Sequence, residues 1–269
     1  MSPWERLVEK PQSQGHFVQM YTDESELARS VGQYLYHGLR FGDGVLVIAT
    51  PDHQKRFKEE LIRLGADVPA LLRGRRLAFF DAGNTLAQCL ASGSPDWRAF
   101  EKTVRAAMSH VRAPEGSLRA YGEMVGLLWN AKRSSAAVRL EQLWNHLLEQ
   151  SAFSLYCAYP IGVFDRDFDA GRIDGVLCAH THLIPTRLDG ALEAALNRSL
   201  DEIVGPEADA FRSCSRSAAR SAWAVMPAAE ATLLSLRENY PREADRIVRR
   251  AQDHYRARLA SSVAPPRRD

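Results

Sequence analysis

The stretch Ser117-Leu-Arg-Ala-Tyr-Gly-Glu-Met-Val-Gly-Leu-Leu-Trp129 combines a short strand, a glycine and the start of an apolar helix. In an open parallel α/β sheet, ligands bind at the carboxyl ends of the strands. This pattern therefore predicts an α/β fold with a binding site close to the polar and aromatic residues Arg119, Tyr121, Glu123 and Trp129. An alternative remains open, in which Glu123 only caps the helix and Trp129 fills the core.

Apolar runs of strand length alternate with helix-like segments on both sides of this stretch. Further strands are expected at residues 16–21, 43–50, 76–81 and 153–159. Helices are expected between them, where apolar residues recur every three or four positions. This alternation predicts βαβ units and a three-layer, mainly parallel sheet flanked by helices.

The residues after Pro160 follow a different pattern, and the chain is expected to divide into several parts. These are a flexible lead-in at 1–14, an α/β domain at 15–204, a Ser- and Arg-rich linker at 205–222, a C-terminal helical extension at 223–262 and a disordered tail at 263–269. Residues 176–185 fit either a helix end or a short extended segment, and both alternatives remain open.

Composition and charge disfavour several classes of protein. No run approaches the roughly 18 apolar residues that a transmembrane helix needs. The charged N-terminus lacks the apolar core of a signal peptide, so we expect a cytoplasmic protein without a membrane partner. The net charge is +2, and the basic surplus is confined to residues 205–269, with 12 Arg against 8 acidic residues. Nucleic acid is therefore not an expected partner, except weakly through this tail.

The first strand-to-helix turn argues against a nucleotide site. A phosphate loop needs glycines and a lysine, because backbone N–H groups and the ammonium group hold the phosphate. The turn here reads Tyr21-Thr-Asp-Glu-Ser-Glu-Leu27 and carries three carboxylates instead. The chain also has no GxGxxG after a strand and no GxSxG turn, which disfavours a dinucleotide site and an α/β-hydrolase.

The pair in His180-Thr-His182 is the most metal-like feature of the sequence. A His-x-His pair on a strand points both side chains the same way, and Cys178 with a distant ligand would complete a zinc site. No second cluster is visible, so hydrogen bonding to a ligand or to nearby backbone is the favoured interpretation. The four cysteines are far apart and form no CxxC pair, which is typical of buried free thiols.

Aromatic and histidine side chains collect near the predicted strand ends. Tyr121 and Tyr159 each terminate a strand, and apolar surface with a few polar groups is typical of a small-molecule pocket. His16 and His53 lie near strand ends, where a structural and a functional role remain equally open. No Ser or Cys stands in an activating turn, so no nucleophile is predicted.

Six ordered motifs, spread over about residues 14–186, together resemble the MEDS domain, a sensory domain named for methanogens, methylotrophs and the regulator DcmR. The motifs are His16-Phe-Val-Gln-Met-Tyr21, Gly42-Asp-Gly-Val-Leu-Val-Ile-Ala-Thr50 with His53, Arg119-Ala-Tyr-Gly-Glu-Met-Val125 with Leu128-Trp129, Leu140-Glu-Gln-Leu-Trp-Asn145, Leu155-Tyr-Cys-Ala-Tyr-Pro160 and Cys178-Ala-His-Thr-His182. The resemblance implies a RecA/KaiC-like core without a phosphate loop, and an input module for small molecules such as one-carbon or hydrocarbon compounds. Such domains often precede a kinase or a DNA-binding region. No kinase motif follows here, so residues 205–269 are the expected output.

The residues and the resemblance together predict a non-enzymatic sensor that binds a small ligand and relays the signal through its C-terminal helices to a regulator, a kinase or a second copy. The expected ligand-binding residues are His16, Tyr21, Arg119, Tyr121, Glu123, Trp129, Tyr159, His180 and His182. Arg119 is expected to pair with an anionic or polar group of the ligand. No catalytic residue and no cofactor is assigned.

Two alternatives to the sensor remain open. One is a divergent nucleotide- or metal-dependent enzyme on the same core, with Glu123 as the base and Asp81 or the histidines as metal ligands. The other is a scaffold whose tail binds a partner.

Overall fold

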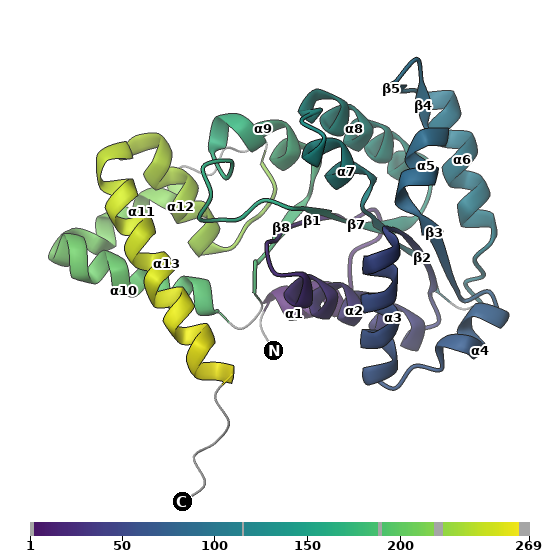
Figure 1. Cartoon of the computed structure of the whole chain (residues 1–269), viewed down its shortest axis with the longest axis horizontal. Coiled ribbons are helices and arrows are strands. Elements are labelled where there is room, and N and C mark those ends of the chain that lie inside the picture. Colours follow the sequence, from purple (N-terminus) through teal and green to yellow (C-terminus); the bar gives the residue numbers. More distant parts are fainter. Residues whose placement is uncertain (1–2, 115, 188–189, 218–222, 264–269) are drawn as a thin grey trace, which may run out of the picture.

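The computed structural model describes residues 3–114, 116–187, 190–217 and 223–263. Its centre is a sheet of six parallel strands in the order β3-β2-β6-β7-β1-β8 (Figure 1). The strands are β1 (His16–Met20), β2 (Gly44–Ala49), β3 (Leu77–Asp81), β6 (Leu118–Gly122), β7 (Phe153–Tyr159) and β8 (His182–Ile184). The parallel sheet between helices confirms the predicted α/β class.

Five of the six strands form where the sequence predicts them. Residues 176–185, which fit either a helix end or an extended segment, contain both. Helix α9 (Ala170–Ala179) ends there, His180 is its C-cap, and His182 begins β8 at the edge of the sheet. A small antiparallel pair, β4 (Leu90–Ala91) and β5 (Ser94–Pro95), was not predicted, because strands of two residues leave no periodic pattern.

Helices cover both faces of the sheet (Figure 1). One face carries α1 (Pro3–Glu9), α2 (Glu24–Arg40), α3 (Pro51–Arg63) and α4 (Val68–Arg73). The other face carries α5 (Ala82–Gln88), α6 (Trp97–Ser109), α7 (Met124–Asn130), α8 (Ser134–Gln150) and α9. The side chains between the sheet and α1–α4 form one core, called the first core, and those on the other face form the second core. Because side chains alternate along a strand, Tyr156 belongs to the first core and Cys157 to the second.

The C-terminal helices lie beyond β8 and continue the second core. They are α10 (Ala191–Val204), the 3₁₀ turn η1 (Gly205–Glu207), α11 (Ala208–Ser217), α12 (Ala228–Asn239) and α13 (Pro241–Val263). Val225 extends the sheet beyond β8, because it accepts from Leu183 N at 2.8 Å and donates to Thr181 O at 2.9 Å. Leu233 and Ile247 are fully buried in the same cluster as the sheet residues. The extension therefore packs directly on the α/β domain.

Two flanking segments are more ordered than the sequence suggests. Helix α1 forms in the expected lead-in, because Val8 is buried against the first core. Helix α11 forms in the first part of the expected linker, and its Phe211 ring lies 4.7 Å from that of Tyr240. Residues 218–222 of that linker and residues 264–269 of the expected disordered tail lie outside the described residues. Within the described ranges, no helix combines the length and the apolar character needed to cross a membrane.

Candidate functional site

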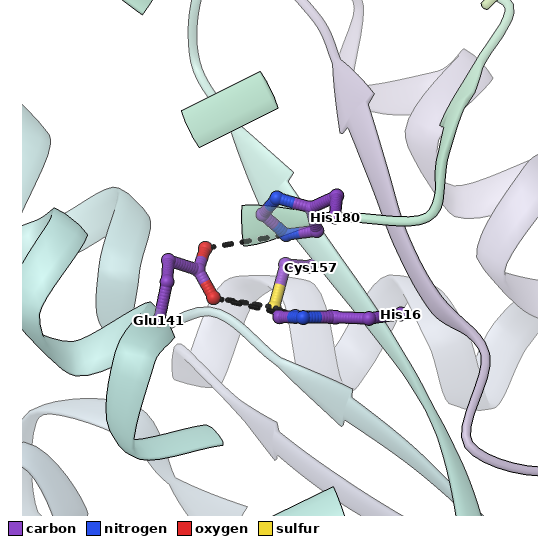
Figure 2. A group of neighbouring side chains, drawn as sticks. All are labelled: His16, Glu141, Cys157 and His180. Atoms are coloured by element: carbon purple, nitrogen blue, oxygen red, sulfur yellow. Dashed lines mark hydrogen bonds and ion pairs between the residues drawn. The ribbon is translucent and has the colours of Figure 1, made fainter. Parts of the chain in front are cut away.

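Four side chains meet in the core between β1, β7, α8 and α9 (Figure 2). These are His16, Glu141, Cys157 and His180, referred to below as the buried tetrad. Their exposed fractions are 1%, 0%, 0% and 5%. One nitrogen, oxygen or sulfur atom from each lies within 4.8 Å of the corresponding atom of every other member. So much polarity in one buried place is unusual unless the groups act together.

Each member of the tetrad sits where local structure directs it toward this point. His16 opens β1 and Cys157 lies in β7, and both point to the face covered by α8. Glu141 occupies a position in the buried stripe of α8, beside Leu140 and Trp144. His180 is the C-cap of α9, which returns to the sheet just before β8.

Backbone carbonyls fix the tautomers of both histidines. His16 Nδ1 lies 3.0 Å from Ala179 O and 2.8 Å from Asn145 Oδ1, and Asn145 Nδ2 donates to the same carbonyl at 2.7 Å. His180 Nδ1 lies 2.7 Å from Val176 O. Because a carbonyl oxygen only accepts, Nδ1 carries the proton in both rings. When a ring carries no second proton, it presents the lone pair of Nε2 to the tetrad.

The atoms inside the tetrad are mostly acceptors. His16 Nε2 lies 3.3 Å from Glu141 Oε2 and 3.4 Å from Cys157 Sγ. His180 Nε2 lies 3.4 Å from Glu141 Oε1, in a direction that makes no hydrogen bond, and it has no other partner. Tyr159 donates its hydroxyl hydrogen to Glu141 Oε1 at 2.8 Å.

The surroundings control the charges of these groups. Burial opposes the ionised form of Glu141, but the two histidines hold its pKa well below the usual range. Burial and the neighbouring His180 lower the pKa of His16. Burial and the Glu141 carboxylate raise the pKa of the Cys157 thiol. An ionised Glu141 needs a positive partner at this buried place, which is either a protonated histidine of the tetrad or a bound cation.

A second polar cluster, the edge group, lies at the carboxyl ends of β2 and β6. Glu123 is 5% exposed. Its Oε2 accepts from Thr50 N at 2.9 Å, and its Oε1 lies 2.8 Å from His53 Nδ1. The other ring nitrogen of His53 contacts Glu24, whose side chain is 47% exposed. Burial lowers the pKa of His53, but the two carboxylates outweigh it and raise that pKa overall. The two carboxylates therefore favour the protonated form of His53.

In the turn after β1, a side chain of the chain itself caps the backbone N–H groups at the start of α2. Asp23 is the N-cap of α2, and its Oδ1 accepts from Ser25 N at 2.8 Å and from Glu26 N at 3.3 Å. In a phosphate-binding turn such backbone N–H groups hold the phosphate. Here a carboxylate of the chain already uses them.

A third place, referred to below as the Trp129 cleft, is a cavity of about 410 Å³. It lies between the end of α7, the start of α8 and the segment that leads into α9. The Trp129 ring contacts the Tyr159 ring edge-on, with centroids 5.5 Å apart and planes at 87°. The lining residues are Trp129, Lys132, Ser134, Asp167, Gly171 and Arg172. The cleft combines an aromatic wall with two cations, of which Arg172 is paired with Asp167.

The predicted ligand-binding residues separate into these places. His16 and His180 belong to the tetrad, and Tyr159 joins it to the Trp129 cleft. Glu123 belongs to the edge group, and the Tyr21 ring lies 5.9 Å from that of His53. The structure thus divides the predicted set among neighbouring sites.

Three other candidates lie apart from all three places, and a fourth, Tyr121, lies beside the edge group, where burial and the neighbouring Glu123 raise its pKa. Arg119 lies near the amino end of β6, where Nε donates to Asp43 Oδ2 at 2.7 Å and the guanidinium also donates to three backbone carbonyls. Tyr121 packs on Phe57 in the first core, and His182 packs on Phe17. Cys178 is exposed, so of the suggested metal ligands only His180 reaches the tetrad.

Sequence reasoning missed Glu141, Cys157, Lys132 and Arg172. A carboxylate at a core position of an amphipathic helix is a usable signal for Glu141, because such a position otherwise holds an apolar residue. Cys157 carries no local signal, since a lone cysteine in a buried strand is ordinary. Lys132 and Arg172 are 40 positions apart, and only the fold brings them to one cavity.

One comparison with known families is informative. The family model described as "MEDS: MEthanogen/methylotroph, DcmR Sensory domain" matches residues 15–181. This range contains the whole tetrad, the edge group and the lining of the Trp129 cleft, and it ends just before β8. No curated protein matches the chain significantly.

Proposed function

Because the chain belongs to the MEDS family of sensory domains, we propose that it binds a small ligand at the carboxyl edge of its sheet and relays that binding through its C-terminal helices. The Trp129 cleft is the proposed ligand site. One observation carries this choice: Arg172 lines both the Trp129 cleft and a second cavity that borders the C-terminal helices.

The chemistry of the cleft favours a ligand with an anionic or strongly polar head and a small apolar part. Lys132 and Arg172 place two cations against one anion, Asp167. The start of α8 adds the positive end of a helix of 17 residues, whose N-cap Arg133 makes no side-chain capping hydrogen bond. Trp129 supplies the apolar surface, with Tyr159 packed behind it.

A physical route leads from the cleft to the C-terminal helices. The second cavity, of about 390 Å³, is lined by Arg166, Asp169, Arg172, Arg237, Pro241, Ala244 and Asp245. Arg237 of α12 donates to Asp165 O at 2.7 Å and also to Phe168 O. A ligand anion that pairs with Arg172 would break its ion pair with Asp167. This would shift residues 165–168, whose carbonyls accept from Arg237. Helices α12 and α13 would then present the change to a partner protein or to a second copy of the chain.

The test measures thermal stabilisation by small organic anions, each added alone. Formate, acetate and benzoate are suitable probes, because they share a carboxylate and differ in apolar size. We expect at least one of them to raise the Tm of the wild-type protein. Arg172→Gln should abolish the shift, whereas Arg139→Gln, which removes an exposed cation from α8, should retain it. Equal shifts for both variants, or no shift for the wild type with any anion, would contradict the proposed site.

A further inference from the structure

We propose that the buried tetrad is a metal centre that takes one divalent transition-metal ion, with zinc as the best fit to its donors. This site is distinct from the ligand cleft of the proposed function. It contains Glu141 and Cys157, for which the sequence analysis predicts no role. The proposal rests on the donor atoms, their spacing and their charges.

The tetrad has fewer hydrogen-bond donors than acceptors. The carbonyls of Ala179 and Val176 take the Nδ1–H groups of the two histidines, so in neutral rings both Nε2 atoms offer lone pairs. Tyr159 gives its hydrogen to Glu141. The only remaining hydrogen is that of the Cys157 thiol, which lies 3.4 Å from His16 Nε2 and 3.6 Å from Glu141 Oε2. His180 Nε2 is left buried and without a partner. A metal cation at the centre would accept an electron pair from each of the four side chains, and so take the place of the missing hydrogen-bond donors.

The spacing suits a tetrahedral ion. A tetrahedral zinc ion with bonds of about 2.0–2.3 Å keeps neighbouring donor atoms roughly 3.3–3.8 Å apart. His16 Nε2 lies 3.3 Å from Glu141 Oε2 and 3.4 Å from Cys157 Sγ, and these oxygen and sulfur atoms are 3.6 Å apart. His180 Nε2 lies 3.4 Å from the other carboxylate oxygen, Oε1, and the four donor atoms all lie within 4.8 Å of one another. Figure 2 shows the two imidazole rings and the sulfur gathered beside the carboxylate of Glu141, whose two oxygens face His180 and His16.

Charge and ligand type also fit zinc. Binding releases the proton of the Cys157 thiol to solvent, so Zn²⁺ meets one thiolate, one carboxylate and two neutral imidazoles. The two negative ligands cancel the charge of the ion, which leaves a neutral site in the core. Two nitrogens, one oxygen and one sulfur form a donor set typical of zinc, whereas calcium and magnesium prefer oxygen alone.

The centre would fasten four elements together. Its ligands come from β1, α8, β7 and the end of α9, and all four side chains are buried. Helix α9 in turn contacts the C-terminal part, because Ala224 N donates to Leu177 O at 2.9 Å and Trp223 Nε1 donates to Asp174 Oδ1 at 2.8 Å. Four protein ligands in a closed site are typical of structural zinc. The expected role is therefore to hold the core against which the C-terminal helices pack.

The experiment measures metal in the full-length, untagged protein, produced in zinc-supplemented medium and purified without chelator. We expect about one equivalent of zinc per chain by inductively coupled plasma mass spectrometry. Cys157→Ser and His180→Gln should lose most of it. Cys178→Ser and His182→Gln are matched controls, since each changes the same residue type close by but outside the tetrad, and both should keep it.

A cobalt measurement keeps the test independent of whether the variants fold. Wild-type protein stripped of zinc and refilled with Co²⁺ should show the visible spectrum of a tetrahedral ion with a thiolate-to-cobalt charge-transfer band. Absence of metal in the wild type together with no Co²⁺ spectrum would overturn the proposal and leave a proton shared by Glu141 and the histidines. Equal zinc in Cys157→Ser, His180→Gln and the two controls would also overturn it.

Discussion

Tyr159 donates its hydroxyl hydrogen to Glu141 Oε1 at 2.8 Å, while its ring lies 5.5 Å from the ring of Trp129. One buried side chain therefore contacts both the wall of the proposed ligand cleft and a proposed metal ligand. Tyr159 thus connects the two proposed sites by direct contact.

The Tyr159 hydroxyl should tune the metal centre. Tyr159→Phe keeps the ring but removes the hydrogen bond that orients the Glu141 carboxylate. We expect zinc affinity to fall roughly 10-fold, as for other outer-shell groups, when measured by competition with a chromophoric chelator. Tyr156→Phe is the control, because its hydroxyl donates to Gln19 on the other face of the sheet. The same loss in both variants would show that the effect is not specific to the tetrad.

Asn145 should act as a positioning residue for His16. Its Oδ1 lies 2.8 Å from His16 Nδ1, and its amide also holds Ala179 O. Asn145→Ala should lower zinc affinity about 10–100-fold by releasing the ring orientation, in the same chelator competition. Gln142→Ala changes an exposed residue of the same helix and should leave the affinity unchanged. Wild-type affinity in Asn145→Ala would argue against this orienting role.

Arg119 should stabilise the fold. It is 3% exposed and pairs with Asp43, so Arg119→Ala leaves a buried carboxylate without its partner. We expect a loss of about 3–5 kcal/mol in the free energy of unfolding, measured by urea denaturation. Arg139→Ala, at an exposed position, should change it by less than about 0.5 kcal/mol. A stable Arg119→Ala protein that no longer responds to ligand would instead favour the sequence-based role in ligand binding.

Glu230 should make the fold sensitive to pH. It is 2% exposed, its Oε1 accepts from Thr186 N at 3.0 Å, and burial raises its pKa to about 7. Because the folded state holds this proton more tightly than the unfolded chain, its contribution is full below about pH 4 and is lost as the pH rises to 7. The loss amounts to about 3 kcal/mol for a shift of this size.

The matched measurement for Glu230 is urea denaturation of wild type and Glu230→Gln between pH 4 and 8. The glutamine keeps an acceptor for Thr186 and has no proton to lose, so its stability should fall less across this range. Glu149→Gln, at an exposed position, should follow the wild-type curve. Parallel curves for Glu230→Gln and wild type would contradict the assignment.

The sequence predicts the sheet well because its signal is local. Continuous apolar runs such as residues 43–50 mark strands buried on both faces, and they form the central strands of the structure. Helix α11 was missed because its apolar residues are few and flanked by serine and arginine. It docks through contacts with distant residues, such as that of Phe211 with Tyr240 and that of Arg212 with Asp201. A tertiary contact of this kind has no signature in the local sequence.

The candidate sites are less predictable because they depend on distant residues. His16 and Glu141 are 125 positions apart, and the pairing of β1 with β7 below α8 brings them together. The Cys178-Ala-His-Thr-His182 motif suggested neighbouring ligands, but α9 ends within it. The helix leaves Cys178 exposed and turns only His180 inward. Spacing along the chain was therefore a poor guide to which side chains meet in the core.

Native mass spectrometry tests most directly whether the Trp129 cleft binds a small ligand. The purified protein is incubated with the low-molecular-weight fraction of a cell extract, alongside Arg172→Gln and Arg139→Gln, and is then measured under native and denaturing conditions. We predict an added mass beyond zinc in wild type and Arg139→Gln, which denaturation releases and which Arg172→Gln lacks. No added mass in the wild type, or the same added mass in Arg172→Gln, would contradict a ligand-binding role for this cleft.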